Sequence, residues 1–407
     1  MIGVSVLFAL LSAIVVHAAP PLENQAADLH RLRLQIKALK ETSTVLDLIR
    51  AEGYPVENYY ATTSDGYILN IHRIPHGKTG KRNGRVAFLQ HGLLASSSDW
   101  VIAGSDKALA YVLANEGYDV WMGNLRGNRY SRNHTTLNPD KDAEFWHFSW
   151  HEMGETDLPT MIDYVLEHTG ADGVYYVGHS QGTTTFFVMG SVKPEYNRKI
   201  KAHVSLAPIV FMNHMTSPLL KMVAAWHGVL TGLFEMIGVN EFLPSSKFLN
   251  FTANFCSRGL TQILCENSLF ALCGYSPQEM NITLLATVMA HTPAGASTRQ
   301  IMHYGQGIST GIFRRYDFGW KENRKIYGTL HPPEYELQHV TAPVYLIYSK
   351  NDWLAAESDV EKLYARLGNS KGRFLLSDYS FNHLDYTFGI NAHKIVYPKV
   401  LSLFGRH

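Results

Sequence analysis

Hydrophobic and polar residues alternate along most of this chain as short apolar runs followed by amphipathic stretches. Between residues 158 and 166 the apolar positions recur at i, i+3, i+4, i+7 and i+8, and Gly170 follows. This spacing predicts one helix with an apolar face and a glycine beyond its end. The next apolar run, 174–177, is short and continuous as in a buried strand, and residues 183–192 predict another helix before Pro194.

The same succession of strand and helix recurs on both sides of this stretch. Strands are predicted at 85–90, 118–122, 342–348 and 373–376, and helices at 106–116 and 392–404. Near the start, alternation on both sides of Ser64-Asp65-Gly66 predicts an antiparallel hairpin. Repeated strand–loop–helix units predict a mostly parallel sheet flanked by helices, the α/β class, whose ligands collect at the carboxyl ends of the strands.

A different sequence pattern interrupts the alternation of strands and helices between residues 211 and 336. Helical patterns there are separated by Pro, Gly and Asn, which predicts an inserted helical cap or lid. The stretch Leu219–Ile237 is apolar on most sides. Two interpretations of it stay open, a core helix or a helix that faces an acyl pocket or a lipid surface.

The N-terminus has the features of an export signal. Residues 2–16 form an uncharged apolar run that is short for a membrane span, and small residues precede a cleavage site after Ala18 or Ala19. No later segment is predicted to anchor the chain in a membrane. The predicted organisation is therefore a signal peptide (1–18), an N-terminal extension or helical pro-segment (19–44), the first part of the core (45–210), the cap (211–336) and the second part of the core (337–407).

Composition narrows the class of function. The 407 residues are 46% hydrophobic, enough for a large core with an insertion. Because 36 Lys and Arg balance 35 Asp and Glu, there is no basic footprint for nucleic acid.

Glycosylation and cysteine usage agree with a secretory route. Three Asn-x-Ser/Thr sites are predicted to carry glycans, at Asn133, Asn250 and Asn281. The three cysteines are Cys256, Cys265 and Cys273. An odd number leaves at least one thiol without an intramolecular bridge, and a short-loop disulfide between two neighbours is open.

Gly178-His179-Ser180-Gln181-Gly182 directly follows the predicted strand 174–177 and precedes a predicted helix. This G-x-S-x-G context is typical of a nucleophile elbow, a sharp turn that lifts the serine hydroxyl above the sheet. The flanking glycines leave room where side chains would clash. We therefore predict that Ser180 is a nucleophile.

A serine hydroxyl needs a base to take its proton and an acid to orient that base. On a sheet of this kind the chain order is Ser, then Asp or Glu, then His. Asp352 follows the strand 342–348, and His383 follows the last strand. We predict His383 as the general base and acid and Asp352 as its partner, with Asp378 and Asp385 as alternatives for the acid.

Attack on an ester creates an oxyanion that needs preorganised N–H donors. One is expected from the residue after the nucleophile, Gln181, and the other from the loop after the strand that ends at His91-Gly92, at Leu93. This chemistry involves neither a metal ion nor a cofactor.

Six motifs together resemble those of the acid lipases, the group that contains gastric and lysosomal acid lipase. They occupy residues 65–69, 88–100, 124–128, 178–182, 349–352 and 382–385. The resemblance runs from about residue 45 to the C-terminus. The segment 20–44 departs from the vertebrate members and resembles insect ones.

The resemblance implies an α/β-hydrolase fold with a helical cap that hydrolyses lipid esters, such as triacylglycerols or sterol esters, at an oil–water or membrane interface. It implies an acyl-enzyme on Ser180, with Asp352 and His383 completing the triad and Leu93 and Gln181 forming the oxyanion hole. It further implies a disulfide between Cys256 and Cys265, with Cys273 a free thiol.

Other functions stay open on the sequence alone. A carboxylesterase or acyltransferase for smaller esters uses the same scaffold, and a non-enzymatic lipid carrier would predict a lost triad residue. The chain is expected to act as a monomer outside the cell, with the lysosome as the alternative compartment.

Overall fold

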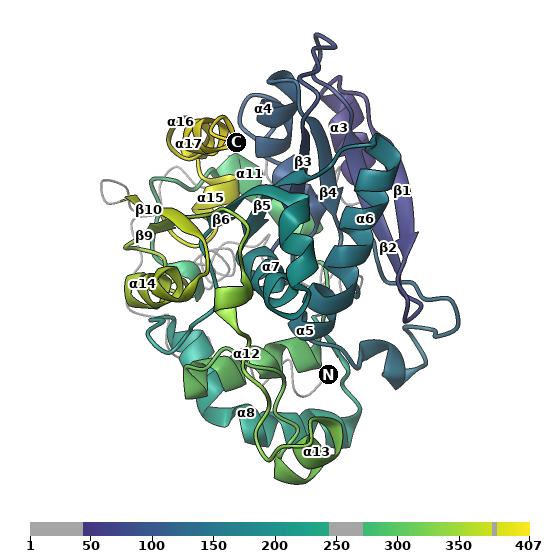
Figure 1. Cartoon of the computed structure of the whole chain (residues 1–407), viewed down its shortest axis with the longest axis vertical. Helices are drawn as coiled ribbons and strands as arrows, with labels where there is room; N and C mark the ends of the chain where they lie inside the picture. The colour runs from purple at the N-terminus through teal and green to yellow at the C-terminus, as the bar shows by residue number, and fades with distance from the viewer. Residues whose placement is uncertain (1–43, 244–271, 377–380) are drawn as a thin grey trace, which may run out of the picture.

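The computed structural model describes residues 44–243, 272–376 and 381–407. Within these residues an eight-stranded sheet has the order β1-β2-β4-β3-β5-β6-β9-β10. Its strands are β1 (Glu57–Thr62), β2 (Ile68–Ile74), β3 (Val86–Gln90), β4 (Asp119–Gly123), β5 (Val174–His179), β6 (Ile200–Leu206), β9 (Val344–Ser349) and β10 (Ser370–Leu376). Antiparallel pairing joins β1 to β2 and β2 to β4, and the other neighbours are parallel (Figure 1). The predicted hairpin and mostly parallel sheet are confirmed.

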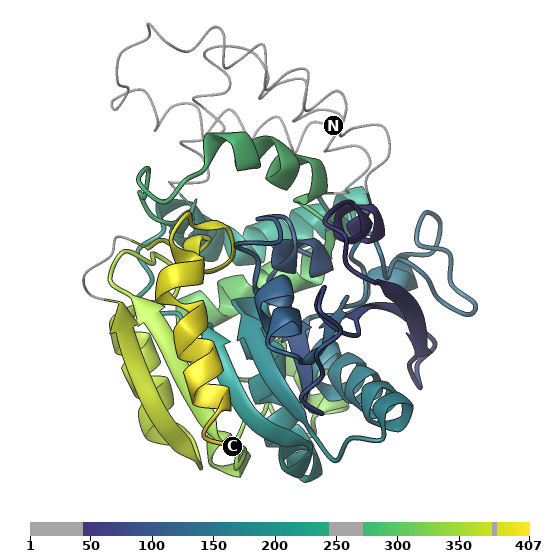
Figure 2. The same cartoon turned by 90° about the horizontal axis from the view of Figure 1, so that it is seen from above.

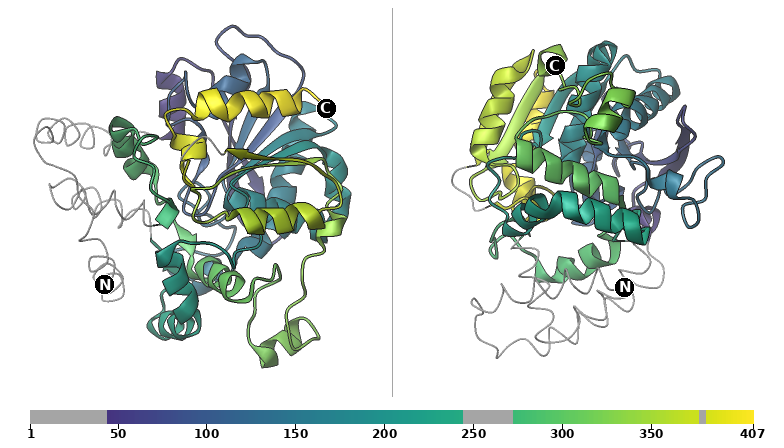
Figure 3. Two further views of the ribbon diagram at one scale, coloured as in Figure 1. Left: turned by 90° about the vertical axis from the view of Figure 1, so that its left-hand side faces the viewer. Right: turned by 90° about the horizontal axis from the view of Figure 1, so that it is seen from below.

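Helices cover both faces of this sheet. Two lie on one face, α4 (Leu109–Asn115) and α17 (Tyr397–Phe404), and three on the other, α6 (Leu158–Thr169), α7 (Gln181–Val192) and α14 (Glu357–Arg366). Figure 3 shows α14 and α17 on opposite sides of β9 and β10, and Figure 2 shows α17 along the sheet. Short helices complete the body: α3 (Val45–Ala51), α5 (Trp150–Glu152), α15 (Asp385–Phe388) and α16 (Ala392–Ile395).

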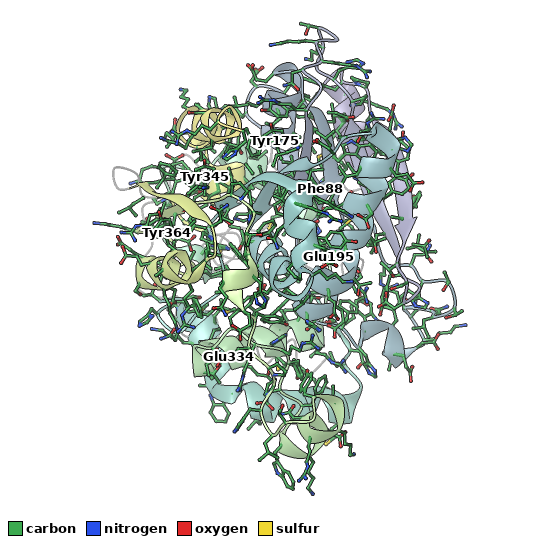
Figure 4. The ribbon with its side chains drawn as sticks, in the orientation of Figure 1. Phe88, Tyr175, Glu195, Glu334, Tyr345 and Tyr364 are labelled. Carbon is green, nitrogen blue, oxygen red and sulfur yellow. The ribbon has the colours of Figure 1, made fainter. Side chains whose placement is uncertain are left out.

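The central strands are buried on both faces, as their continuous apolar runs predict. Successive side chains of β5 point to opposite faces. Tyr175 meets Phe404 of α17 with ring centroids 5.0 Å apart, whereas Tyr176 stacks on Phe88 of β3 at 5.8 Å and also packs on Phe186 of α7. Figure 4 labels Phe88 and Tyr175 on these neighbouring strands. The core therefore extends through the sheet from α7 to α17.

The described residues between β6 and β9, 207–243 and 272–343, are called the insert below. The insert contains α8 (Pro218–Ile237), β7 (Glu241–Phe242), α11 (Ile282–His291), β8 (Ala296–Ser297), α12 (Thr298–Thr310) and α13 (Trp320–Ile326). Helices α8 and α12 run side by side beneath the body (Figures 1 and 3). The interruption of the α/β pattern is thus a largely helical addition to the fold.

Helix α8 exposes part of its apolar surface. Trp226, Val229 and Met236 are 59%, 64% and 77% exposed, whereas Ala224 is buried on the side that packs toward α12. The helix is therefore neither wholly core nor wholly surface. No helix of the described ranges is long and apolar enough to cross a membrane.

Two helices differ from their predicted extents. The helix expected from residue 106 begins at Leu109, because Ala108 has extended backbone angles. The closing helix expected over 392–404 is divided into α16 and α17, because Pro398 in the first turn of α17 cannot donate the hydrogen bond that would continue one helix. The predicted pro-segment 19–44 lies, except for Thr44, outside the described residues.

A buried arginine, Arg126, connects the hairpin to the parallel part of the sheet by hydrogen bonds. Arg126, just after β4, donates from Nε to Asp157 at 2.7 Å and from its terminal nitrogens to Asp65 at 2.6 and 3.0 Å. Its guanidinium also lies 3.9 Å from the ring centroid of Tyr67. These contacts hold the loop after β4 in one place, close to the carboxyl end of β3.

Candidate active site

Ser180 sits at a sharp turn between β5 and α7. Its φ of 53° lies in the left-handed region, which costs free energy for any residue but glycine. A Cβ on Gly182 would lie 2.2 Å from the backbone oxygen of Gln90, and one on Gly178 would lie 2.7 Å from backbone atoms of Gly182. Both glycines are therefore required for β3, β5 and α7 to approach this closely.

The three residues predicted to act together lie within hydrogen-bond distance. The hydroxyl of Ser180 is 2.7 Å from His383 Nε2, and His383 Nδ1 is 3.0 and 2.9 Å from the two oxygens of Asp352. With its proton on Nδ1, His383 donates to the carboxylate and turns the lone pair of Nε2 toward the serine. Ser180, Asp352 and His383 are 9%, 3% and 3% exposed, so water screens these contacts little.

Asp352 is held in place by its own turn. Its Oδ1 accepts the backbone N–H groups of Leu354 and Ala355, each at 2.9 Å. Asp385, an alternative acid, instead accepts the backbone N–H of Asn382 at 2.6 Å, and burial raises the pKa of its carboxyl to about 7. Asp378, the other alternative, lies outside the described residues. The geometry therefore pairs His383 with Asp352 and not with Asp385.

Gln181 directly follows the serine, and Leu93 lies in the loop after β3 that approaches it. Gln181 is the first residue of α7, where N–H groups have no intrahelical partner and the helix dipole is positive. Gly92 approaches Ser180 so closely that an added Cβ would be 3.1 Å from the serine Cβ, and Leu93 is the next residue. Both N–H groups are therefore candidates for the oxyanion donors that the sequence predicts.

Other predicted sites lie elsewhere. Asn133 is exposed next to the hairpin, and Asn281 is half-buried just before α11. Asn250, Cys256 and Cys265 fall outside the described residues. Cys273 is buried, which raises the pKa of its thiol well above the usual value. Across the described residues no group of three or more His, Cys, Asp or Glu side chains is arranged to hold a metal ion.

Comparison with known proteins places the chain in a family. A model of the partial alpha/beta-hydrolase lipase region matches residues 45–104, and a model of the alpha/beta hydrolase fold matches residues 88–389. Lipase 3 of Drosophila melanogaster is 44% identical over 91% of this chain and 95% of its own length. Gastric triacylglycerol lipase of Rattus norvegicus is 38% identical over 88% and 91%, and lysosomal acid lipase/cholesteryl ester hydrolase of Macaca fascicularis is 38% identical over 89% and 91%.

The chain belongs to the acid lipase family. It is therefore an α/β hydrolase of the lipase and esterase type. Among solved structures, a soluble variant of monoglyceride lipase from Saccharomyces cerevisiae matches 90% of this chain and 96% of its own with a TM-score of 0.53 and 13% identity. At that identity the likeness supports the α/β-hydrolase fold alone.

A buried histidine supports the Leu93 side of the site in this acid lipase. His91 Nε2 accepts the N–H of Leu125 at 3.2 Å and lies 3.1 Å from the amide nitrogen of Asn128. Two donors on Nε2 leave the ring proton on Nδ1, which donates to the Gly92 carbonyl at 2.7 Å. Burial lowers the pKa of His91 to about 4, so the ring is neutral. Because C=O and N–H point in opposite directions in a trans peptide, fixing the Gly92 carbonyl also aims the Leu93 N–H.

A second buried histidine, His179, contacts His383. His179 Nε2 donates to the backbone carbonyl of His383 at 2.8 Å, and burial lowers the pKa of His179 to about 3. Its position between Gly178 and Ser180 places it on β5, next to the loop of His383. Sequence reasoning missed this contact, because His179 filled a variable position of the G-x-S-x-G pattern.

The insert also contacts the loops that carry Asp352 and His383. The carbonyl of Cys273 accepts the N–H of His383 at 3.1 Å and that of Trp353 at 3.3 Å, and the side chain of Asn382 donates to the carbonyl of Gly274 at 3.0 Å. A Cβ on Gly274 would lie 2.1 Å from the backbone oxygen of Asn351. The segment of the insert at Cys273 and Gly274 therefore lies between the loops that carry Asp352 and His383. No sequence pattern predicted this contact.

Proposed function

We propose that this acid lipase hydrolyses the carboxylic esters of neutral lipids, triacylglycerols or sterol esters, through an acyl-enzyme on Ser180. The observation that carries the proposal is the unbroken series of contacts from Asp352 through His383 to Ser180 at 3.0 Å or less. It is supported by the relatives named a triacylglycerol lipase and a cholesteryl ester hydrolase.

In this mechanism Ser180 attacks the ester carbonyl carbon while His383 Nε2 takes the hydroxyl proton. Asp352 stabilises the resulting imidazolium, and the N–H groups of Leu93 and Gln181 hold the oxyanion. The imidazolium gives its proton to the departing alkoxide, which leaves as the alcohol. Water then attacks the acyl-enzyme by the same route, releasing the fatty acid and regenerating the serine.

The surroundings of the serine agree with an apolar substrate. Leu93 packs against an apolar cluster of the insert that contains Ile301 and Met302. Helix α8, in the same insert, presents Trp226 and Met236 to solvent. A charged or strongly polar substrate would meet few partners on these side chains.

The route through the cell belongs to the same proposal. The chain is exported after cleavage near Ala18, carries glycans at Asn133, Asn250 and Asn281, and has a disulfide between Cys256 and Cys265. It acts as a monomer outside the cell or in the lysosome. Digestion with an endoglycosidase and non-reducing peptide mapping test the glycans and the disulfide directly.

The proposed function is tested by measuring the hydrolysis of several substrates over a range of pH. Purified protein is assayed on emulsions of a triacylglycerol, a sterol ester and a phospholipid, and on a soluble acetate ester, between pH 4 and 8. We expect fatty acid release from the neutral lipid emulsions to exceed that from the other two substrates. Faster cleavage of the monomeric acetate ester than of every emulsion would contradict the proposal and favour a small-ester esterase.

A further inference from the structure

The side chain of Gln181 has partners that the mechanism above does not use. Its backbone N–H is the expected oxyanion donor, whereas its side-chain amide is buried between the insert and Met153 of the body, whose sulfur lies 3.5 Å from Nε2. Oε1 accepts a hydrogen bond from Gln300 Nε2 at 3.1 Å and another from the Tyr304 hydroxyl at 3.2 Å. Gln300 and Tyr304 are four residues apart on α12, so they share one face of that helix.

This contact is desolvated and firmly supported. Gln181, Gln300 and Tyr304 are 1%, 2% and 9% exposed. Gln300 also accepts the N–H of Ser297 at 2.8 Å in a capping box that starts α12, and the Ser297 hydroxyl donates to the carbonyl of Phe148 at 2.6 Å. The start of α12 is therefore fixed to the body of the protein on the same side as Gln181.

The other half of the oxyanion hole meets the same part of the insert. The side chain of Leu93 packs against the cluster of Ile301 and Met302 on α12. Just before α12, the N–H of Ala294 donates to the carbonyl of Leu94 at 2.6 Å. Leu94 has a φ of 60°, a conformation that needs such external support in a residue other than glycine.

We propose that α12 positions the oxyanion hole, with Gln300 and Tyr304 as positioning residues that act through the side chain of Gln181. The helix reaches both donor residues, Gln181 by hydrogen bonds and Leu93 by packing. The packing of the insert on the body then determines the distance between the backbone N–H groups of Leu93 and Gln181. This inference rests on the proposed function, because it assigns a role in the same ester chemistry.

The test compares substitutions on two faces of α12. Tyr304→Phe removes one hydroxyl and leaves the capping box intact, and Gln300→Ala removes the amide. Gln306→Ala is the matched control, because Gln306 also donates one hydrogen bond and accepts one, both with the backbone of Asp317 at 2.8 and 2.9 Å. Thermal unfolding of each variant measures how much of any loss is structural.

Two readouts separate positioning from general damage, kcat and KM for a soluble p-nitrophenyl ester and inhibition by a phenylboronic acid. The boronate places a hydroxyl where the oxyanion forms. We expect kcat to fall about tenfold for Gln300→Ala and about threefold for Tyr304→Phe, fractions of the roughly 10²–10³-fold loss when an oxyanion donor is removed. Boronate inhibition should weaken by the same factors, with KM within about twofold of wild type and Gln306→Ala unchanged in both readouts.

Each other outcome overturns the inference. If Gln300→Ala and Tyr304→Phe match Gln306→Ala in kcat and boronate inhibition, or if only KM rises, α12 does not position the oxyanion hole. If the wild-type protein cleaves no ester and binds no boronate, the proposed function fails and the inference falls with it. Wild-type activity thus distinguishes the two failures.

Discussion

The elbow that carries Ser180 and the loop 91–95 beside it reach their conformations in different ways. The elbow at Ser180 depends on two glycines of its own motif, since Gly178 and Gly182 allow β5, α7 and β3 to approach where a Cβ would clash. The loop 91–95 is determined by distant residues, since Asn128 and Ala294 contact it from the loop after β4 and from the insert. The motif is therefore sufficient to recognise the elbow, whereas the loop depends on the whole fold.

The largest expected effect, on folding stability, comes from adding a side chain at Gly182 of the elbow. Gly182→Ala places a Cβ 2.2 Å from a backbone oxygen that no rotamer change can move. We expect a loss of more than about 3 kcal/mol of folding free energy, or no soluble protein, because overpacking against backbone forces strands apart. Urea unfolding and expression yield measure it.

Gly170→Ala is the control for this substitution. Unlike Gly182, Gly170 has a positive φ, 69°, and no atom lies within 4 Å of its added Cβ. Its cost should stay near about 1 kcal/mol, the strain of a left-handed residue. Equal losses at the two glycines would mean that crowding does not determine the elbow.

The next effect comes from removing the support of the loop. His91→Ala deletes the donor to the Gly92 carbonyl, and the Leu93 N–H loses its fixed direction. We expect kcat/KM for a soluble ester to fall by about 10²-fold, near the value of one oxyanion donor. His203→Ala, which removes another fully buried neutral histidine, should lower the unfolding temperature but change kcat/KM less than about twofold. Similar kcat/KM values in the two variants would leave His91 with a structural role only.

The two segments also share a dependence on pH. Burial lowers the pKa of His91 to about 4 and that of His179 to about 3, whereas an unfolded histidine titrates near about 6.5. Below that pH the two histidines bind protons in the unfolded chain but stay neutral in the folded protein. Their stabilisation is therefore complete above pH 6.5 and is lost as the pH falls toward 4 and 3.

Urea unfolding between pH 4.5 and 7.5 measures this slope. His91→Gln should be less stable than wild type at pH 7.5. On acidification it should lose up to about 3 kcal/mol less stability than wild type, because glutamine binds no proton in the unfolded chain. Parallel profiles for the two proteins would show that His91 titrates alike in the folded and unfolded states.

The smallest effect is expected at the Asp65–Arg126 ion pair, which contacts the loop 91–95 only indirectly. Asp65→Asn weakens the pair with Arg126, whose loop carries the Leu125 N–H that His91 accepts. Because the Asp65 side chain is 43% exposed, the loss should be about 1 kcal/mol in stability. Turnover should change less than about threefold. A tenfold loss of kcat would mean that the Asp65–Arg126 pair, and not only His91, holds the loop in its active position.

The same contrast explains what the sequence could predict. Strand and helix periodicity predicted the sheet and most helices, and Ser180, Asp352 and His383 were expected because each follows a strand end. The supports of the site were not expected. His179 and the carbonyl of Cys273 act through backbone atoms of residues far along the chain, and Gln300 looks like any polar helix residue. Such contacts depend on tertiary packing, which leaves no local pattern.

We propose that Ser180 attacks the ester bond of neutral lipids. The most direct measurement compares fatty acid release from a triacylglycerol emulsion by wild type and Ser180→Ala, with peptide mass spectrometry of wild type quenched by acid during turnover. We predict an acyl group on the Ser180 peptide and at least about a 10³-fold loss of release in the variant, with its unfolding temperature nearly unchanged. A folded Ser180→Ala protein that keeps more than about a tenth of the activity, or an acyl group on another residue, would contradict the account.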